Sequence, residues 1–412
     1  MEKSWFLALL FLQIIPTKDA FGVGGGISVG GGGVWIGGGI NTPNPSGSSN
    51  SRLDKAYTAL QAWKSAITDD PFGILETWVG SNVCSYRGVF CADPQEMSTP
   101  PGLVVAGIDL NHANLQGSLV KELSLLSDMS LLHLNSNRFT GTVPNTFRDL
   151  SSLSELDLSN NHFSGPFPSV TLFIPNLKYL DLRFNNFSGP ISEDLFNRNL
   201  DAIFLNNNQF EGPIPLNLGN SPASVINLAN NKFSGNIPLS FGYMGPAIKE
   251  VLLLNNQLTG CIPEGVGFLR EMEVLDVSFN SLMGQLPNSI SCLNEIEVLN
   301  LAHNKLSGVL PDPVCSLRSL VNLTVSYNFF SGFSQDCTKL YFRNVGFDFA
   351  VNCIPGRDMQ RPQPECSIIP GGGLNCLRIP SGRPLVCGLM VQTPDTNPSP
   401  PSKMVSPSIS PP

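Results

Sequence analysis

Hydrophobic and polar positions along residues 103–334 follow one pattern that recurs ten times. Its clearest copies are LDLSNNHFSGPFP (156–168), VINLANNKFSGNIP (225–238) and VLNLAHNKLSGVLP (298–311). Apolar residues stand five and three positions before an asparagine, and most copies have Gly-x-x-Pro after it. The aligned residues, 23 to 25 positions apart, are Ala113 in a degenerate first copy and then Asn137, Asn161, Asn185, Asn208, Asn231, Asn256, Asn280, Asn304 and Asn328. The pattern predicts a short strand and a turn in every copy.

A period this regular indicates a solenoid, and LxLxxNxLxGxIP at about 24 residues is typical of leucine-rich repeats. We expect Leu156 and Leu158 to face inward from their strand and Phe163, two places after the asparagine, to close the core. The asparagines should form a buried ladder, because their amides can satisfy backbone groups where the chain leaves each strand. The predicted fold is an α/β repeat, a right-handed leucine-rich repeat solenoid of about ten stacked repeats. Its LxGxIP half resembles the plant-type subclass.

The sequence on either side of the repeats divides into further segments. Residues 1–20 are predicted to be a signal peptide, because Lys3 precedes an apolar run, Trp5–Ile15, that is too short to span a bilayer. The other predicted segments are a Gly-rich disordered segment (21–50), an N-terminal cap (51–102), a Cys-rich C-terminal cap or hinge (335–390) and a Pro/Ser-rich disordered tail (391–412).

The N-terminal cap contains one helical pattern. Its apolar side carries Trp63, and Asp70-Pro71 is expected to end the helix. Trp63 and Trp78 are expected to belong to the core of the cap. The segment CSYRGVFC (84–91) resembles the cap of plant extracellular repeat proteins. That resemblance implies a Cys84–Cys91 disulfide and a cap that covers the open end of the first repeat.

The ten cysteines suit disulfides in an oxidising compartment. Cys315 lies one turn of the solenoid before Cys337, so these two are expected to pair. Cys261 and Cys292 lie in neighbouring repeats and are expected to staple them together. The remaining pairings stay open, including an intermolecular bridge that would make a homodimer, for Cys353, Cys366, Cys376 and Cys387. No CxxC pair exists and the four histidines are scattered, so we expect no metal and no cofactor.

Charge narrows the range of partners. Only 14% of residues are charged and the formal net charge is −8, which disfavours nucleic acid and favours a basic partner. P-loop, zinc-finger and dinucleotide-binding fingerprints are absent, and we expect no membrane span. Two sequons predict glycosylation at Asn186 and Asn322.

Residues four, two and one before each ladder asparagine are predicted to face outward from the sheet. The first of these columns holds four carboxylates, and it reads Asp109, His133, Asp157, Asp181, Phe204, Asn227, Leu252, Asp276, Asn300 and Thr324. The last column adds Phe184, Phe279 and Tyr327. Asp and Asn that merely solvate strand edges are the alternative interpretation. That alternative would not place Phe184, Phe204, Phe279 and Leu252 on an exposed side.

Carboxylates beside exposed apolar residues favour a contact surface for a basic peptide or protein. The predicted contact residues are Asp157, Tyr179, Asp181, Arg183, Phe184, Phe204, Asp276 and Phe279, with Arg183 as a hydrogen-bonding anchor. Asp157 and Asp181 should lie about 4.8 Å apart on adjacent strands, a spacing that superficially suits a glycosidase pair. An open, shallow face lacks the pocket that catalysis needs, so we expect no enzyme.

Several segments together resemble the plant leucine-rich repeat extensin family. They are GGGGVWIGGGI, DKAYTALQAWKSAITDDPFG, GSNVCSYRGVFC, LDLRFNNFSG, FLNNNQF and LGNSPASVINLANNKF, followed by the Cys-rich hinge. The resemblance covers roughly residues 21–390. It implies a secreted protein of the plant cell wall or apoplast. It also implies that the repeats bind basic, Cys-containing peptides of the rapid alkalinisation factor type, in wall integrity and growth.

The tail departs from that family. Extensin tails carry long Ser-Pro-Pro-Pro-Pro runs with tyrosines, whereas residues 391–412 have no tyrosine and no run of more than two prolines. We therefore expect a short-tailed, extensin-like relative, for which contact with wall polysaccharide through the tail is an open expectation. Two alternatives are a polygalacturonase-inhibitor-like defence protein and a purely structural wall protein. The Gly-rich lead and the long hinge argue against the former.

Overall fold

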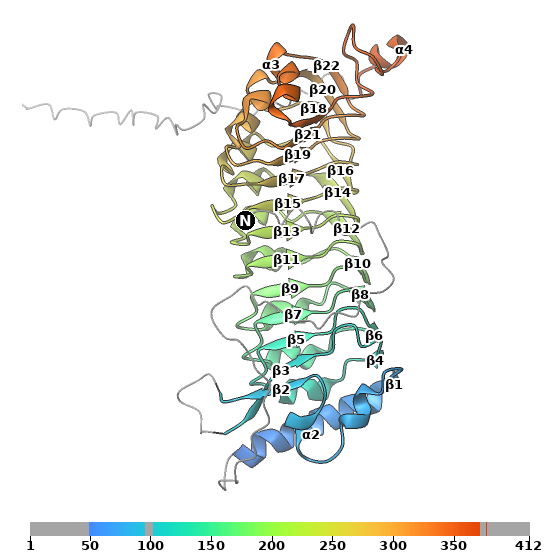
Figure 1. The fold of residues 1–412 in the computed structure, drawn as a ribbon, viewed down its shortest axis with the longest axis vertical. Helices are drawn as coiled ribbons and strands as arrows, with labels where there is room; N and C mark the ends of the chain where they lie inside the picture. Colours follow the sequence, from blue (N-terminus) through green and yellow to red (C-terminus); the bar gives the residue numbers. More distant parts are fainter. Residues whose placement is uncertain (1–48, 95–101, 371–375, 377–412) are drawn as a thin grey trace, which may run out of the picture. The chain divides into compact units, whose positions relative to one another are not determined.

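The computed structural model describes residues 49–94, 102–370 and 376. Successive coils stack one on another, and each contributes a strand to a main sheet, a second extended segment and a short 3-10 helix (Figure 1). The predicted leucine-rich repeat solenoid is therefore confirmed. The predicted signal peptide, residues 21–48 of the predicted Gly-rich segment and the Pro-rich tail lie outside the described residues, whereas Ser49 and Asn50, the last two residues of that segment, begin a helix.

The main sheet has twelve strands, and all neighbours are parallel except the first pair. In chain order its strands are β2 (Val89–Ala92), β3 (Val104–Asp109), β5 (Leu131–His133), β7 (Glu155–Asp157), β9 (Tyr179–Asp181), β11 (Ala202–Phe204), β13 (Val225–Asn227), β15 (Glu250–Leu252), β17 (Val274–Asp276), β19 (Val298–Asn300), β21 (Asn322–Thr324) and β23 (Gly346–Asp348). The middle residue of each three-residue strand from β5 to β21 is at most 1% exposed. Because side chains alternate along a strand, its last residue faces away from the core.

A second sheet runs beside the main sheet. Its strands are β1 (Ile67–Asp69), β4 (Gln116–Ser118), β6 (Arg138–Gly141), β8 (His162–Pro166), β10 (Asn186–Gly189), β12 (Gln209–Pro213), β14 (Lys232–Asn236) and β16 (Gln257–Thr259). A separate three-stranded sheet continues it with β18 (Met283–Gln285), β20 (Lys305–Leu310) and β22 (Phe329–Phe333). Asn186 is exposed on β10, and Asn322 is exposed at the start of β21.

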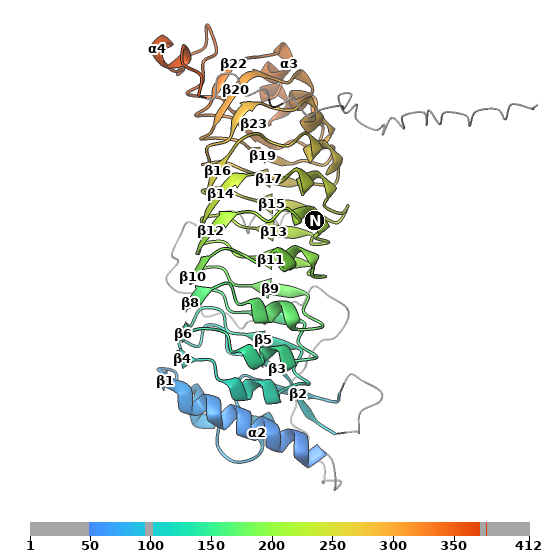
Figure 2. The ribbon, with the colours of Figure 1, turned by 180° about the vertical axis from the view of Figure 1, so that it is seen from behind.

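Short 3-10 helices line the edge of the stack opposite the second sheet (Figures 1 and 2). They are η3 (Lys121–Leu125), η4 (Asn145–Asp149), η5 (Ser169–Phe173), η6 (Glu193–Asn197), η7 (Leu218–Asn220), η8 (Leu239–Tyr243), η9 (Glu264–Phe268), η10 (Asn288–Cys292) and η11 (Asp312–Ser316). The proline of the repeat directly precedes several of them, as Pro263 precedes η9. Its fixed φ and missing N–H suit a position just outside a helix start.

The asparagine ladder is present. The Asn161 Nδ2 donates to the carbonyls of Leu134, Leu158 and Ser159 at 2.8, 3.2 and 2.9 Å. Its Oδ1 accepts the backbone N–H of Phe139 at 2.9 Å. The same set of bonds recurs along the stack, for example at Asn304. Each amide therefore ties its own coil to the preceding one.

The repeat array continues one coil beyond the predicted limit at residue 334. Strand β23 pairs in parallel with β21, and Asn352, 24 residues after Asn328, is fully buried. Its Nδ2 donates to the carbonyls of Val325, Phe349 and Ala350, and its Oδ1 accepts from Phe330. The first part of the predicted hinge is therefore an eleventh coil. It also contains α3 (Gln335–Thr338) and η12 (Tyr341–Arg343), and α4 (Gln363–Cys366) follows.

The N-terminal cap is built on α2 (Ser49–Ala66), followed by η1 (Ile74–Thr77) and η2 (Val83–Ser85). Trp63 and Trp78 are buried, as expected, and Trp63 stacks on Phe139 of the repeats with ring centroids 5.8 Å apart. The helix ends at Ala66, earlier than predicted, because β1 pairs with β4 immediately afterwards. Asp70 instead accepts the N–H groups of Ile74 and Leu75.

The disulfides correct one prediction. Cys84–Cys91 and Cys315–Cys337 pair as expected. Cys261 does not pair with Cys292; it pairs with Cys376, 115 residues away, and Cys292 lies in a different disulfide. Cys353 pairs with Cys366. The bond to Cys376 thus ties the end of the described chain to the side of an earlier coil.

Candidate functional site

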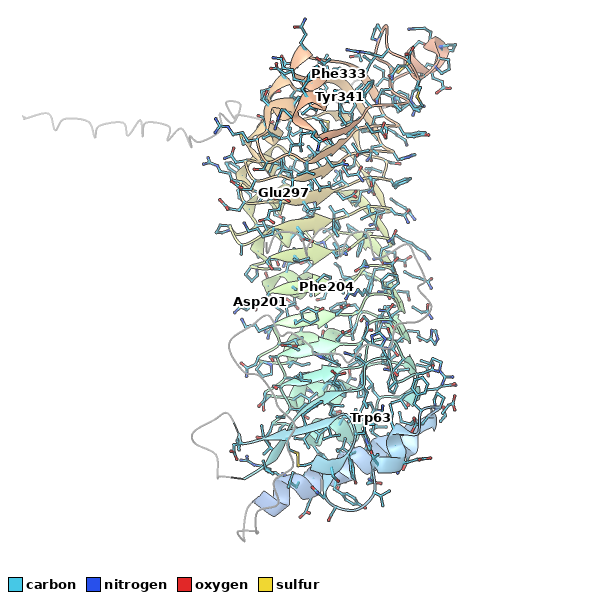
Figure 3. All side chains as sticks on the ribbon, in the orientation of Figure 1. Trp63, Asp201, Phe204, Glu297, Phe333 and Tyr341 are labelled. Carbon is cyan, nitrogen blue, oxygen red and sulfur yellow. A yellow bond between two sulfur atoms is a disulfide. The ribbon has the colours of Figure 1, made fainter. Side chains whose placement is uncertain are left out.

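The outward positions of the main sheet form what we call the main-sheet face. It comprises the residues four, two and one before each ladder position. Asp201 and Glu297 lie along the edge where the strands begin, and Phe204 lies on the face itself (Figure 3). The eight predicted contact residues all lie on or beside this face, but they do not form one continuous patch.

Acidic residues at the strand ends have a structural role that the sequence analysis missed. The Asp157 Oδ1 accepts the backbone N–H of Ser159 at 2.9 Å, and the Asp276 Oδ1 accepts that of Ser278 at 2.9 Å. Asn227 and Asn300 make the corresponding bond. These bonds define Asx turns, in which a short Asp or Asn side chain accepts the backbone N–H of the residue two positions later. A column of Asp and Asn is therefore not by itself a sign of ligand binding.

Five predicted residues do meet on β7, β9 and β11 and just after β9, where Arg183 lies. We call them the central cluster: Asp157, Tyr179, Asp181, Arg183 and Phe204. The Arg183 Nε lies 3.0 Å from the Asp181 Oδ2, and the Tyr179 hydroxyl donates to the same oxygen at 3.2 Å. The Arg183 guanidinium lies 5.1 Å from the centre of the Phe204 ring. Tyr179 and Phe204 contact each other at 5.6 Å between ring centroids.

Burial within this cluster corrects the prediction that Asp181 is exposed. Asp181 is 0% exposed, whereas Asp157, Tyr179, Arg183 and Phe204 are partly exposed. Burial and, to a smaller extent, the nearby Asp157 carboxylate raise the pKa of Asp181 against the opposing effect of Arg183, to a net value of about 7. Burial also raises the pKa of Tyr179. The charge of Asp181 therefore depends on pH near neutrality.

The acidic field extends along the starts of the strands on both sides of the central cluster. His133 contacts Glu155 at 3.0 Å, and this contact raises the pKa of His133 against the opposing effect of burial. Further along, burial raises the pKa of Glu250 to about 7, with a smaller contribution from Glu273. Within the described part of the chain, no side chain pairs with the Asp157 Oδ2. Asp157 can therefore offer that oxygen to a ligand.

Residues one before the ladder form a column in the left-handed region, with φ between 52° and 58° from His112 to Val351. Asparagine tolerates this conformation, whereas bulky residues adopt it rarely and at a cost. Phe184, Phe279, His303 and Tyr327 nevertheless occupy it. Large rings held in this conformation mark the column as a functional candidate.

Three of these rings stack face to face, and we call Phe279, His303 and Tyr327 the aromatic stack. Their centroids lie 4.1 and 4.0 Å apart, with interplanar angles of 13° and 12°. Phe279 is 50% and Tyr327 is 44% exposed, so the two outer rings of the stack are open to solvent. Burial lowers the pKa of His303 and Asp348 opposes that shift. His303 was missed, although reading the last column continuously through all repeats would have placed it between the two predicted rings.

The stack and the central cluster are separate. Strands β11 and β17 are three positions apart in the sheet, about 14 Å at the usual strand spacing. Between them, Leu252 is 5% exposed, which corrects the prediction that it faces solvent. Asp276 is 8% exposed and bonded to Ser278 and Asn300, so it too is less available than predicted.

Asn206 is the other residue that the sequence analysis missed. It lies two residues after Phe204 and is fully buried, and neither its Nδ2 nor its Oδ1 has a hydrogen-bond partner. A buried amide without partners costs about 1–3 kcal/mol for each unpaired group. Such a residue beside a surface cluster is a candidate for pairing with a ligand.

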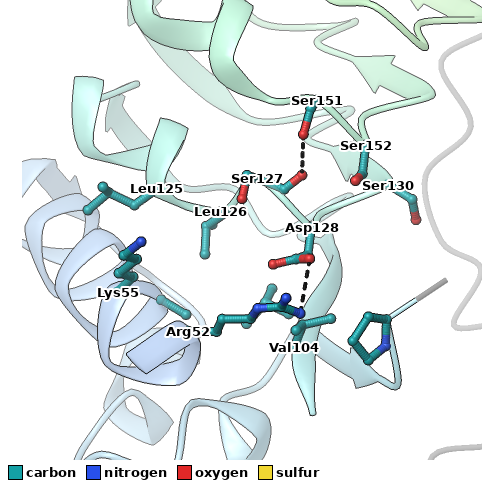
Figure 4. Close-up of a pocket in the computed structure, with 13 residues that line it drawn as sticks. Arg52, Lys55, Val104, Leu125, Leu126, Ser127, Asp128, Ser130, Ser151 and Ser152 are labelled. Atoms are coloured by element: carbon teal, nitrogen blue, oxygen red, sulfur yellow. Dashed lines mark hydrogen bonds and ion pairs between the residues drawn. The ribbon is translucent and has the colours of Figure 1, made fainter. Parts of the chain in front are cut away.

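A hollow between α2 and the first coils is a weaker candidate (Figure 4). Arg52 lies there 3.5 Å from Asp128, and the hydroxyl of Ser151 donates to the Ser127 carbonyl. Arg52 is thus already partnered, and none of the predicted contact residues lines the hollow. Among the described residues, no group of three or more His, Cys, Asp or Glu is arranged to hold a metal. None of the described helices is long and apolar enough to cross a membrane.

Comparison with known proteins agrees with this architecture. A model of the leucine rich repeat N-terminal domain matches residues 53–92, and leucine-rich repeat models match residues 127–187, 224–244, 271–293 and 295–317. The ectodomain of the Arabidopsis receptor kinase HAESA, solved with the peptide hormone IDA and the co-receptor SERK1, is 28% identical with a TM-score of 0.63. That match covers 73% of this chain and 50% of the other. A plant ice-binding protein is 26% identical with a TM-score of 0.55, and the match covers 68% of this chain and 88% of that protein. The chain is a leucine-rich repeat protein.

Its curated relatives define the group more closely. Leucine-rich repeat extensin-like protein 7 of Arabidopsis thaliana is 59% identical over 231 residues, which are 56% of this chain and 53% of that protein. Leucine-rich repeat extensin-like protein 2 is 58% identical over 99 residues, 24% and 12% of the two chains. The chain is thus a relative of the leucine-rich repeat extensin-like proteins, and the predicted resemblance is confirmed. It spans about half or less of the length of these relatives. This kinship points to a protein that is not an enzyme.

Proposed function

We propose that this chain is an extracellular cell-wall protein whose main-sheet face binds basic, Cys-containing signalling peptides of the rapid alkalinisation factor type. The observation that carries the proposal is the central cluster, where partly exposed aromatic rings lie beside the Asp157 and Asp181 carboxylates. Apolar surface bordered by negative charge suits a cationic peptide. The described disulfides and the extensin-like relatives support an extracellular location. The HAESA ectodomain, solved with a peptide hormone, is a fold relative that supports peptide binding.

The aromatic stack extends the proposed contact surface toward the C-terminal coils. Partly exposed rings can bury large apolar areas on binding at a small cost in conformational entropy. A peptide that reached from Phe204 to Phe279 would cover about 14 Å, or some four to five extended residues. Glycans at Asn186 and Asn322, both exposed, are part of the proposal.

Charge removal at Asp157 tests the site. Asp157→Asn keeps the oxygen that accepts the Ser159 N–H but removes the charge, so the fold should persist. We expect it to weaken binding of a folded, basic alkalinisation-factor peptide about tenfold, the effect of about 1.4 kcal/mol, in calorimetric titration. Glu211→Gln on the second sheet removes the same charge away from the face and should change affinity less than about twofold.

The outcomes separate three cases. Equal losses in both variants would indicate a general charge effect and contradict a site on this face. Binding that is tight in both variants would move the site elsewhere in the chain. If the unmodified chain bound no basic peptide at all, the proposed function would be wrong.

Affinity for a basic peptide should fall as the pH falls from 8 to 5. Asp181 and Glu250 have pKa values raised to about 7, so both carry negative charge above pH 7 and lose it below. His133 gains positive charge over part of the same range. We expect a loss of about tenfold or more, measured by titration at each pH. In Glu250→Gln the pH dependence of affinity should be shallower. The same pH dependence in that variant and in the unmodified chain would show that Glu250 does not contribute to it.

A further inference from the structure

The neighbours of Arg183 hold its guanidinium in the way that a protein holds an arginine side chain of a ligand. We call Tyr179, Asp181 and Phe204 the arginine cup. Asp181 supplies its carboxylate, and Tyr179 and Phe204 supply two aromatic rings that contact each other. The Arg183 guanidinium contacts the Asp181 Oδ2 at 3.0 Å and lies 5.1 Å from the Phe204 centroid. An ion pair combined with a ring face is the arrangement that a guanidinium prefers.

The two partners of this pair differ in accessibility. The Asp181 side chain is 0% exposed, whereas the Arg183 side chain is 27% exposed. Asp181 is held by its strand and by the bond to the Arg183 N–H, which involves only the backbone of residue 183. Arg183 can therefore swing its side chain into solvent without unfolding a strand. Asp181 would then be a buried acceptor without its cation, which is unfavourable unless another cation replaces it.

Asn206 supplies an independent observation. It occupies, in the next coil, the position that Arg183 occupies in its own, and the Phe184 N–H donates to the Asn206 carbonyl at 3.0 Å. Its side-chain amide has an unpaired donor and an unpaired acceptor in a fully buried setting. A peptide bond also carries one donor and one acceptor, so it can satisfy both groups at once. Buried groups left unpaired in the free protein and paired in the complex favour binding.

We propose that the arginine cup is a subsite for an arginine side chain of a peptide partner, and that Arg183 fills this subsite in the free protein. The incoming guanidinium displaces that of Arg183 from Asp181 and Phe204, and Asn206 pairs with an adjacent peptide bond of the partner. The number of ion pairs is conserved in the exchange. This inference rests on the proposed function only in taking the partner to be a basic peptide.

The test uses N-acetylarginine amide as a probe and the Arg183→Ala variant of the whole chain. Calorimetric titration should show binding to Arg183→Ala at least tenfold tighter than to the unmodified chain, because the internal competitor is gone. N-acetyllysine amide should bind more weakly, since an ammonium lacks the planar fork of donors. Adding Asp181→Asn should abolish the gain. Arg148→Ala, which removes an exposed arginine from η4, is the matched control and should show no gain.

Three results would overturn the inference. They are equal probe binding by Arg183→Ala and the unmodified chain, equal binding of the lysine probe, and binding that survives Asp181→Asn. Arg183→Gln replaces Arg183→Ala if the latter does not fold. Because the probe is a single residue, these results do not depend on whether an alkalinisation-factor peptide binds. With that peptide, loss of affinity in Arg183→Ala would instead make Arg183 a direct contact.

Asn206→Ala provides a second readout. A residue that only supports the fold would lower the unfolding midpoint when truncated. Since Asn206 makes no side-chain hydrogen bond, we expect the midpoint to stay the same or rise, while affinity for the basic peptide falls about tenfold. A lower midpoint with unchanged affinity would contradict its assigned role.

Discussion

Replacing Asn161 by alanine should destabilise the protein by about 3–4 kcal/mol. The Asn161 amide donates to three carbonyls and accepts one N–H. Two of these four groups belong to the preceding coil and two to the coil of Asn161 itself. Asn161 is 5% exposed, so water cannot readily replace these bonds. Removing the side chain leaves the Phe139 N–H buried without its acceptor, and the Leu134 carbonyl keeps only its bond from the Asn137 Nδ2. Guanidinium-induced unfolding of the whole chain measures the loss.

Asn176→Ala is the control for this prediction. Asn176 also donates its Nδ2 to a carbonyl of the preceding coil, that of Ser151 at 2.8 Å, but it is exposed. Water can satisfy the Ser151 carbonyl, so the expected loss is below about 1 kcal/mol. Similar losses in the two variants would mean that the ladder contributes little beyond ordinary surface hydrogen bonds.

The repeat fold was predictable because its signal is periodic. Every coil must bury the same few side chains, so an inward leucine and an asparagine recur at nearly constant spacing. The eleventh coil was missed because Phe347 and Phe349 stand where earlier copies have leucine, isoleucine or valine. The spacing of Asn352 from Asn328 matched the period, but the aromatic residues and the nearby cysteines obscured the pattern.

The sequence predicts which side chains point outward from the main-sheet face, but not which of them are accessible to solvent. Alternation along a strand places Asp181 outward, yet the structure buries it beneath Tyr179, Arg183 and Phe204. Such burial depends on the size of side chains in neighbouring coils. The Asx turns of the acidic column likewise depend on backbone geometry. The Cys261–Cys376 disulfide joins residues 115 positions apart, and no local spacing could reveal it.

Trp63→Ala should destabilise the protein by about 3–5 kcal/mol, chiefly at its N-terminal end. Trp63 is 0% exposed and lies between Trp78 of the cap and Phe139 of the repeats, with ring centroids 5.9 and 5.8 Å away. Phe139 in turn stacks on Phe163, so Trp63 begins a continuous row of rings. Losing it opens a cavity where the cap meets the first coils. Denaturant unfolding measures the loss, and amide hydrogen exchange locates it.

Trp63→Phe separates the packing of the ring from the polar group of the indole. The Trp63 Nε1 is buried without a hydrogen-bond partner, so its removal forfeits no bond and the smaller ring keeps much of the stacking. We expect a loss below about 1.5 kcal/mol.

Coils in a solenoid contact only their neighbours, so faster exchange in Trp63→Ala should be strongest near Phe139 and fade toward β23. Uniform exchange along the whole stack would show instead that the coils unfold as one cooperative unit.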